Sequence, residues 1–162
     1  MDKFWEKILY SDQMKFPMCT AVASQTDESL TNTAVKSVGL VDAHAYSLIA
    51  AKLVKLDSGK TERLIQIRNP WGKKEWEGDW GDKSTKWTPS TKQQVDYKDE
   101  NDGCFWIAFS DYVKFFYITT ICYYYEDQFD NFLPDQHDIK NFGMTKFTLD
   151  EDHSEPLTVA ID

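Results

Sequence analysis

The feature that most constrains the fold is a pair of strand-forming segments joined by a short turn. Residues 44–56 are rich in small and β-branched side chains, and residues 62–68 form a second strand-like run. The four residues 57–60, with the sequence DSGK, are typical of a turn. We therefore predict a long antiparallel hairpin, whose open end brings His44 next to Asn69.

The chain before this hairpin predicts one helix, one strand and one loop. Residues 2–10 place their apolar side chains on one face of a short helix, with Asp2 as its N-cap. Residues 18–24 predict a strand of small residues, and the polar residues 25–36 predict a surface loop. Because the helix begins at the second residue, we expect the chain to be part of a longer protein.

The chain after the hairpin begins with a predicted loop, residues 70–89, that carries four tryptophans. Such a loop is expected to pack on the domain or to frame a cleft. Residues 104–109 predict a strand, Ser110 is expected to cap a helix that runs to residue 116, and residues 117–125 predict a further strand. The predicted fold class is α+β, a twisted antiparallel sheet with short flanking helices.

Length and composition narrow the class of protein. The 162 residues are enough for one domain, which we place at residues 1–126, followed by an acidic linker at 127–162. The net charge of −9 argues against a nucleic-acid partner, and no apolar run approaches the roughly 20 residues of a membrane span. Three cysteines without metal-like spacing, and no signal-peptide pattern, predict reduced thiols in the cytoplasm.

His44 and Asn69 are the candidate catalytic residues, because a histidine beside an asparagine makes two of the three members of a Cys-His-Asn hydrolase site. The small neighbours Ala43 and Ala45 leave the imidazole free to face a cleft. Asn69 would accept the imidazole N–H and fix its tautomer, and Trp71 would cover that hydrogen bond. A satisfied buried histidine and a strand-ending asparagine are the alternatives without chemistry.

None of the three cysteines has the sequence context of a nucleophile. A catalytic thiolate is favoured by a helix N-terminus and a nearby imidazolium. Cys19 lies in a strand-like segment, and Cys104 and Cys122 alternate with bulky apolar residues. We predict buried structural thiols for Cys19 and Cys122, and we assign the nucleophile to none of the three.

Four blocks of sequence resemble the protease core of the calpain family in the same order. They are VGLVDAHAYS at 38–47, RNPWG at 68–72, EWEGDWGD at 75–82 and DGCFWIAF at 102–109. The resemblance spans residues 1 to about 125 and is to the second subdomain of that core, which carries the His and Asn of a papain-like triad.

This resemblance implies a calcium-dependent intracellular cysteine endopeptidase that acts on proteins or peptides. It implies that His44 is the general base and acid, that Asn69 orients it, and that Trp71 shields their hydrogen bond. In calpains the nucleophilic Cys belongs to the first subdomain, which would be a missing partner of this chain, so the fragment alone would be inactive. The alternative is a non-catalytic calpain-like module that binds protein partners, which a parent sequence without that Cys would favour.

The resemblance also implies a Ca²⁺ ion bound between two loops. Glu75 and Asp82 would come from the first loop, and Asp102 with the backbone carbonyl of Glu100 from the second. Oxygen ligands from flexible loops suit Ca²⁺. Cys104 stands where the family often has a Glu, which removes one carboxylate from the set. The tail at 127–162 resembles the entry into the β-sandwich that follows the core.

Overall fold

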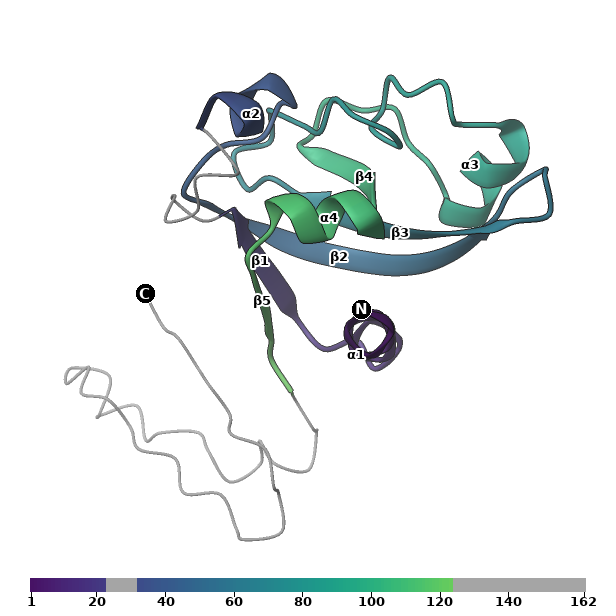
Figure 1. Cartoon of the computed structure of the whole chain (residues 1–162), viewed down its shortest axis with the longest axis horizontal. Helices are drawn as coiled ribbons and strands as arrows, with labels where there is room; N and C mark the ends of the chain where they lie inside the picture. Colours follow the sequence, from purple (N-terminus) through teal and green to yellow (C-terminus); the bar gives the residue numbers. More distant parts are fainter. Residues whose placement is uncertain (23–31, 124–162) are drawn as a thin grey trace, which may run out of the picture. The chain divides into compact units, whose positions relative to one another are not determined.

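The computed structural model describes residues 1–22 and 32–123, which belong to one compact unit, Met1–Tyr123. Short helices are interspersed among the strands along this part of the chain (Figure 1). In chain order they are α1 (Asp2–Gln13), β1 (Met18–Val22), α2 (Asn32–Ser37), β2 (His44–Lys55), β3 (Thr61–Arg68), α3 (Pro89–Val95), β4 (Cys104–Ala108), α4 (Phe109–Phe115) and β5 (Ile118–Ile121).

The five strands form one antiparallel sheet in the order β4-β3-β2-β1-β5. Its centre is the predicted hairpin of β2 and β3, with Ser47 opposite Arg68 near the open end and Lys55 opposite Thr61 at the turn. The turn is closed by two backbone hydrogen bonds of 2.8 Å at Leu56. The predicted α+β class, an antiparallel sheet with short helices, is confirmed.

Two apolar clusters lie on opposite faces of the sheet, and the tryptophan-rich loop contributes Trp76 to the first and Trp80 to the second. Cross-strand partners share a face, and successive residues alternate except at a register shift between Leu48 and Ala50, so the register assigns each strand side chain to one cluster. The first cluster attaches α1 and α4 to the sheet and includes Trp5, Ile8, Tyr46, Leu48, Ile67, Phe105, Phe109 and Tyr112. The second contains Val54, Leu64, Trp80, Val95, Trp106 and Ala108. Each large side chain buried in this way contributes about 1.5–3 kcal/mol.

Helix α3 was not predicted, although its start carries a recognisable signal. Thr88 is the N-cap, Pro89 follows at the first helical position, and Thr88 and Thr91 exchange side-chain to backbone hydrogen bonds in a capping box. The helix lies at the turn end of the hairpin (Figure 1), where the Gln94 amide bonds both backbone groups of Lys55. It closes one end of the second cluster through Val95.

The structure corrects both predicted helix caps. Asp2 lies inside α1, whose N-cap is Met1 without a side-chain hydrogen bond, and the Asp2 carboxylate instead pairs with Arg63 at 2.7 Å. Ser110 lies inside α4, whose N-cap is Ala108, also without a side-chain bond. In both cases the cap lies earlier in the chain than the polar residue, whose backbone is already helical.

Several predicted bounds also change. The segment predicted as a polar loop at 25–36 contains most of α2, and β5 is shorter than the predicted strand at 117–125. Residues 23–24 and 124–125 of two predicted strands lie outside the described residues, as does the whole segment 127–162. The division at residue 126 therefore stays a prediction. No helix within residues 1–22 and 32–123 has the length and apolar character needed to cross a membrane.

Candidate active site

The open end of the hairpin brings the two candidate catalytic residues together. His44 is the first residue of β2 and pairs with Val22 of β1, while Asn69 directly follows β3. The His44 Nε2 and the Asn69 Oδ1 are 2.9 Å apart, which is a hydrogen-bond distance. The predicted juxtaposition is thus present in the structure.

Asn69 is fully buried and every hydrogen-bonding position of its amide is used. Its Nδ2 donates to the carbonyls of Lys73, at 2.7 Å, and Lys74, at 3.1 Å. Its Oδ1 accepts the Trp71 N–H at 3.1 Å and faces His44. Because this oxygen can only accept, the His44 Nε2 must carry the proton, and the neutral ring keeps its lone pair on Nδ1. That is the tautomer a general base needs.

Two aromatic rings hold the imidazole in place. The Trp71 ring lies 4.2 Å from the His44 ring, centroid to centroid, and Tyr46 meets it edge-on at 4.9 Å. The Tyr46 hydroxyl accepts the Val41 N–H at 2.8 Å, and burial raises the Tyr46 pKa. Tyr46 therefore links the turn before β2 to the histidine. Strand alternation puts residue 46 on the same face as residue 44, so this neighbour could have been found from the sequence.

The residue before the histidine has an unusual backbone. Ala43 has a φ of 49°, in the left-handed region, and its N–H donates to the Asp42 Oδ1 at 2.9 Å. A non-glycine residue there costs about 1–2 kcal/mol. His44 itself is half-buried, with the Trp71 and Tyr46 rings against its imidazole, and its predicted opening onto a cleft stays a prediction.

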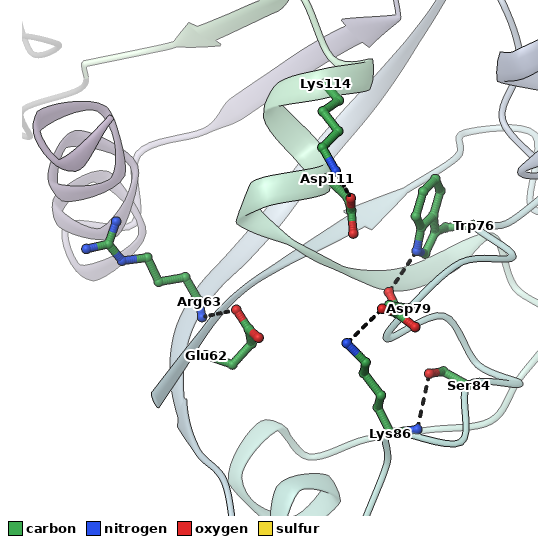
Figure 2. Close-up of polar contacts among 8 residues, drawn as sticks. All are labelled: Glu62, Arg63, Trp76, Asp79, Ser84, Lys86, Asp111 and Lys114. Carbon is green, nitrogen blue, oxygen red and sulfur yellow. Dashed lines mark hydrogen bonds and ion pairs between the residues drawn. The ribbon is translucent and has the colours of Figure 1, made fainter. Parts of the chain in front are cut away.

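The tryptophan-rich loop packs on the domain, as predicted, except at Trp71. Trp76 and Trp80 are buried, whereas Trp71 is 54% exposed beside His44. Figure 2 shows two contacts within the loop: the Trp76 Nε1 donates to the Asp79 carbonyl at 2.8 Å, and the Asp79 carboxylate pairs with Lys86 at 2.7 Å. The buried tryptophans fix the loop, so the exposed one has a defined place next to the histidine.

The carboxylates of the predicted metal set lie near enough to one another for Glu75 and Asp102 to act on the pKa of Asp82. Burial, and then the charge of Glu75, raise the pKa of Asp82 to about 7. Glu75 accepts the Gly103 N–H at 2.8 Å, and the Asp102 Oδ1 accepts the N–H of Cys104 at 2.8 Å. An unneutralised group of carboxylates adds to the effect of burial in raising this pKa.

These residues fit Ca²⁺ by type but are not arranged as a finished site. Their donors are all oxygens, which Ca²⁺ prefers. Within residues 1–22 and 32–123, however, no group of three or more His, Cys, Asp or Glu side chains is placed to hold a metal ion. The Glu100 carbonyl also accepts the Asp102 N–H at 2.9 Å. The two loops would have to close further on an ion.

The raised pKa of Asp82 predicts a pH-dependent stability in the absence of metal. The folded protein holds the Asp82 proton more tightly than the unfolded chain, whose carboxyl titrates near 3.8. The stabilisation of the folded state by protonated Asp82 is therefore complete below pH 3.8 and is lost as the pH rises to about 7. Asp82→Asn should raise the Tm by about 2–3 °C at pH 8 and leave it unchanged at pH 3.5, a small effect because Asp82 is partly exposed and screened. Thermal unfolding in EDTA measures it; an equal effect at both pH values would contradict it.

Comparison with known proteins decides the family. The sequence model of the calpain family cysteine proteases matches residues 1–123. The chain belongs to the calpain family. Human Calpain-14 is 44% identical over 87 residues, which are 52% of this chain and 12% of that protein. The Calpain-1 catalytic subunit of Gallus gallus is 45% identical over 86 residues, 51% of this chain and 12% of that protein.

Calpain-8 of Rattus norvegicus aligns over a longer stretch, with 39% identity over 107 residues, 64% of this chain and 14% of that protein. These alignments thus cover only 12–14% of the length of the calpains they match. The family's reaction is cysteine-dependent proteolysis. The resemblance seen in the four sequence blocks is confirmed at the level of the family.

The cysteines of this calpain-family chain differ from their predicted environments. Cys19 and Cys122 are exposed rather than buried. Cys19 pairs with Ser47 and Thr120, on the face of the sheet that α1 and α4 do not cover, and Cys122 directly follows the edge strand β5. The prediction failed because alternation alone does not show which face is covered.

None of these thiols lies beside the imidazole. Cys19 is three positions along β1 from Val22, the partner of His44, which is about 10 Å, and it lies on the opposite face. Cys104 pairs with Arg68, on the face opposite to Ile67 and His44. Burial, and then the Asp102 carboxylate, raise the pKa of Cys104 to about 11, which disfavours a thiolate.

Proposed function

We propose that this chain supplies the histidine and asparagine of a calpain-type cysteine endopeptidase. The observation that carries the proposal is the 2.9 Å hydrogen bond between the His44 Nε2 and the Asn69 Oδ1, made by an amide whose orientation is fixed by its other hydrogen bonds. This bond leaves the His44 Nδ1 as the atom that exchanges protons. The substrates would be proteins or peptides, in line with the family's reaction.

We infer that the nucleophilic thiol comes from a separate subdomain of the parent protein. The inference is supported by the positions of Cys19, Cys104 and Cys122, none of which lies beside His44 on its face of the sheet. Trp71 is exposed and the His44 imidazole is only half-buried, so both are accessible to a partner subdomain.

The proposed reaction follows from the tautomer of the histidine. The His44 Nδ1 takes the proton of the incoming thiol, and the thiolate attacks the peptide carbonyl to form a thioester. The imidazolium then returns its proton to the departing amine. Asn69 keeps the ring in this orientation in both protonation states, because its Oδ1 accepts a hydrogen bond from the Nε2–H in each of them. The Trp71 ring limits the access of water to this hydrogen bond.

Calcium dependence is a further part of the proposal. We propose that Glu75, Asp82, Asp102 and the Glu100 carbonyl close on one Ca²⁺ ion. The positive charge of the ion would neutralise carboxylates that now raise the pKa of Asp82. The adjacent loops would then be linked next to Asn69, because the Gly103 carbonyl accepts the Asn69 N–H at 2.8 Å. Cys104 contributes no carboxylate, so we expect weak binding.

The calcium proposal predicts a pH-dependent affinity. Calorimetry at pH 8 should show binding of Ca²⁺ in the millimolar range or tighter, which Asp82→Ala weakens by about tenfold or more. Affinity should fall as the pH drops below about 7, where Asp82 takes up a proton. Lys60→Gln, in the distant hairpin turn, serves as control. Identical binding by the wild type and Asp82→Ala would remove Asp82 from the ligand set.

A reconstitution experiment tests the catalytic proposal. The chain is mixed with a thiol-bearing first subdomain from a calpain relative, and cleavage of a fluorogenic peptide is followed with and without Ca²⁺. We expect turnover from the mixture and none from either component alone. A mixture that is associated, as shown by size-exclusion chromatography, but neither cleaves peptide nor reacts with a thiol-directed inhibitor would refute the proposal.

A further inference from the structure

Two exposed lysines, Lys73 and Lys74, follow Asn69 in the loop beside the catalytic pair. The Lys74 Nζ lies over the Trp71 ring, 5.9 Å from its centroid, and that ring also contacts His44 at 4.2 Å between centroids. A cation above an aromatic face within about 6 Å is attracted by the ring quadrupole. The exposed Trp71 ring is thus in contact with the His44 imidazole and within cation–π distance of the Lys74 ammonium group.

The backbone of these lysines is part of the catalytic arrangement. The carbonyls of Lys73 and Lys74 accept the two amide hydrogens of Asn69, at 2.7 and 3.1 Å. Lys74 also has a φ of 64°, in the left-handed region that costs a non-glycine residue about 1–2 kcal/mol. The position of Lys74 relative to His44 is therefore set by the same amide that orients the histidine.

Both lysines are available to an outside anion. Within residues 1–22 and 32–123 the ion pairs involve other cations, among them Lys86 with Asp79 and Lys114 with Asp111 in Figure 2, and neither Lys73 nor Lys74. The nearest carboxylate in sequence, Glu75, already accepts the N–H of Gly103.

Positively charged side chains are concentrated in the segment 68–74 of this acidic chain. The chain has a net charge of −9, yet residues 68–74 contain three cations, Arg68, Lys73 and Lys74, and no carboxylate. Register places Arg68 on the other face of the sheet. Lys73 and Lys74 are therefore the cations that an acidic ligand would meet next to Trp71.

We propose that Lys74, assisted by Lys73, is a specificity-determining residue that binds Asp or Glu side chains at the second and third residues after the scissile bond of the substrate. This inference rests on the proposed function. The proton from His44 goes to the departing amine, so the chain that begins with this amine must start beside the imidazole. The Trp71 ring lies next to that position, and the Lys74 Nζ lies 5.9 Å from the centroid of the same ring. A carboxylate that passes Trp71 would meet this ammonium group, which has no ion pair within the described residues.

A matched pair of peptides tests the inference on the full chain. Ala-Glu-Glu-Ala-amide and Ala-Gln-Gln-Ala-amide, with free amino termini, are titrated while the indole N–H signal of Trp71, assigned with Trp71→Phe, is followed by NMR. The Glu peptide should bind at least about threefold more tightly than the Gln peptide in roughly 20 mM salt, and the difference should shrink in about 0.5 M salt. Lys74→Gln should abolish the difference, whereas Lys60→Gln, an exposed lysine of the hairpin turn, should retain it.

Charge reversal gives a second arm. Lys74→Glu should prefer a Lys-bearing peptide, Ala-Lys-Lys-Ala-amide, over the Glu peptide. Equal binding of the Glu and Gln peptides by the wild type, or equal effects of Lys74→Gln and Lys60→Gln, would overturn the inference. Peptide binding needs no thiol, so a failed reconstitution would refute the proposed function and leave this result standing. A reconstituted protease that cleaves Glu and Gln substrates equally well would support the proposed function and refute the role of Lys74 in specificity.

Discussion

His44→Ala is expected to reduce kcat/KM of the reconstituted protease by about 10⁴-fold or more. The variant loses the group proposed to deprotonate the thiol and to protonate the departing amine, and removing such a residue from a catalytic triad has effects of this size. The fold should be retained, since His44 is half-buried at the end of β2. Steady-state cleavage of a fluorogenic peptide and thermal unfolding of the same samples measure both quantities. Residual activity of His44→Ala above a tenth of the wild-type value would exclude His44 as the base.

Asn69→Ala tests, in the same assay, how much the orientation of the His44 imidazole contributes to activity. The imidazole remains but loses the acceptor of its Nε2 proton, so we expect a loss of about 10²–10⁴-fold in kcat/KM. Asn69 is also fully buried and donates hydrogen bonds to the carbonyls of Lys73 and Lys74. The Tm of Asn69→Ala should therefore fall, unlike the Tm of His44→Ala. Full activity of Asn69→Ala would show that the ring is oriented without this amide.

The hairpin explains how much of the arrangement of His44 and Asn69, the proposed catalytic pair, could be predicted from the sequence. A short turn fixes which residues of β2 and β3 are opposite near the turn, so the sequence predicts that His44 and Asn69 lie close together at the open end. The register shifts between Leu48 and Ala50, however, and this bulge, which the sequence pattern does not reveal, puts His44 and Asn69 on the same face. Tyr46 lies on the face of His44 by alternation within β2. The roles of these residues stay predictions until activity is measured.

Other parts of the site depend on contacts that no local pattern contains. The Lys73 and Lys74 carbonyls reach Asn69 only because the loop turns back at Gly72 and at Lys74, both with positive φ. The exposure of Cys19 depends on where α1 and α4 settle, and those helices lie near opposite ends of the described chain. Sequence periodicity describes one element at a time, whereas these features are set by elements far apart in the chain.

Gly103→Ala is expected to destabilise the protein by about 2–5 kcal/mol. Gly103 has a φ of 86°, and a Cβ there would lie 2.6 Å from the Asn69 carbonyl oxygen and 2.9 Å from the Gly72 Cα. The substitution therefore combines left-handed backbone strain of about 1–2 kcal/mol with overpacking of about 1–3 kcal/mol against backbone atoms that cannot rotate away. Urea unfolding, with the m-value checked, gives the free energy.

Gly59→Ala is the matched control, because Gly59 has a φ of 82° and no atom lies within 4 Å of the position that an alanine Cβ would occupy. It should cost only the backbone contribution, about 1–2 kcal/mol. The Gly103 carbonyl accepts the Asn69 N–H, so only Gly103→Ala should also shift the NMR signals of the His44 imidazole. Equal destabilisation by the two substitutions would show that backbone conformation alone constrains Gly103. A larger loss with unchanged His44 signals would show that the strain stays in the Gly72–Gly103 contact and does not reach His44 and Asn69.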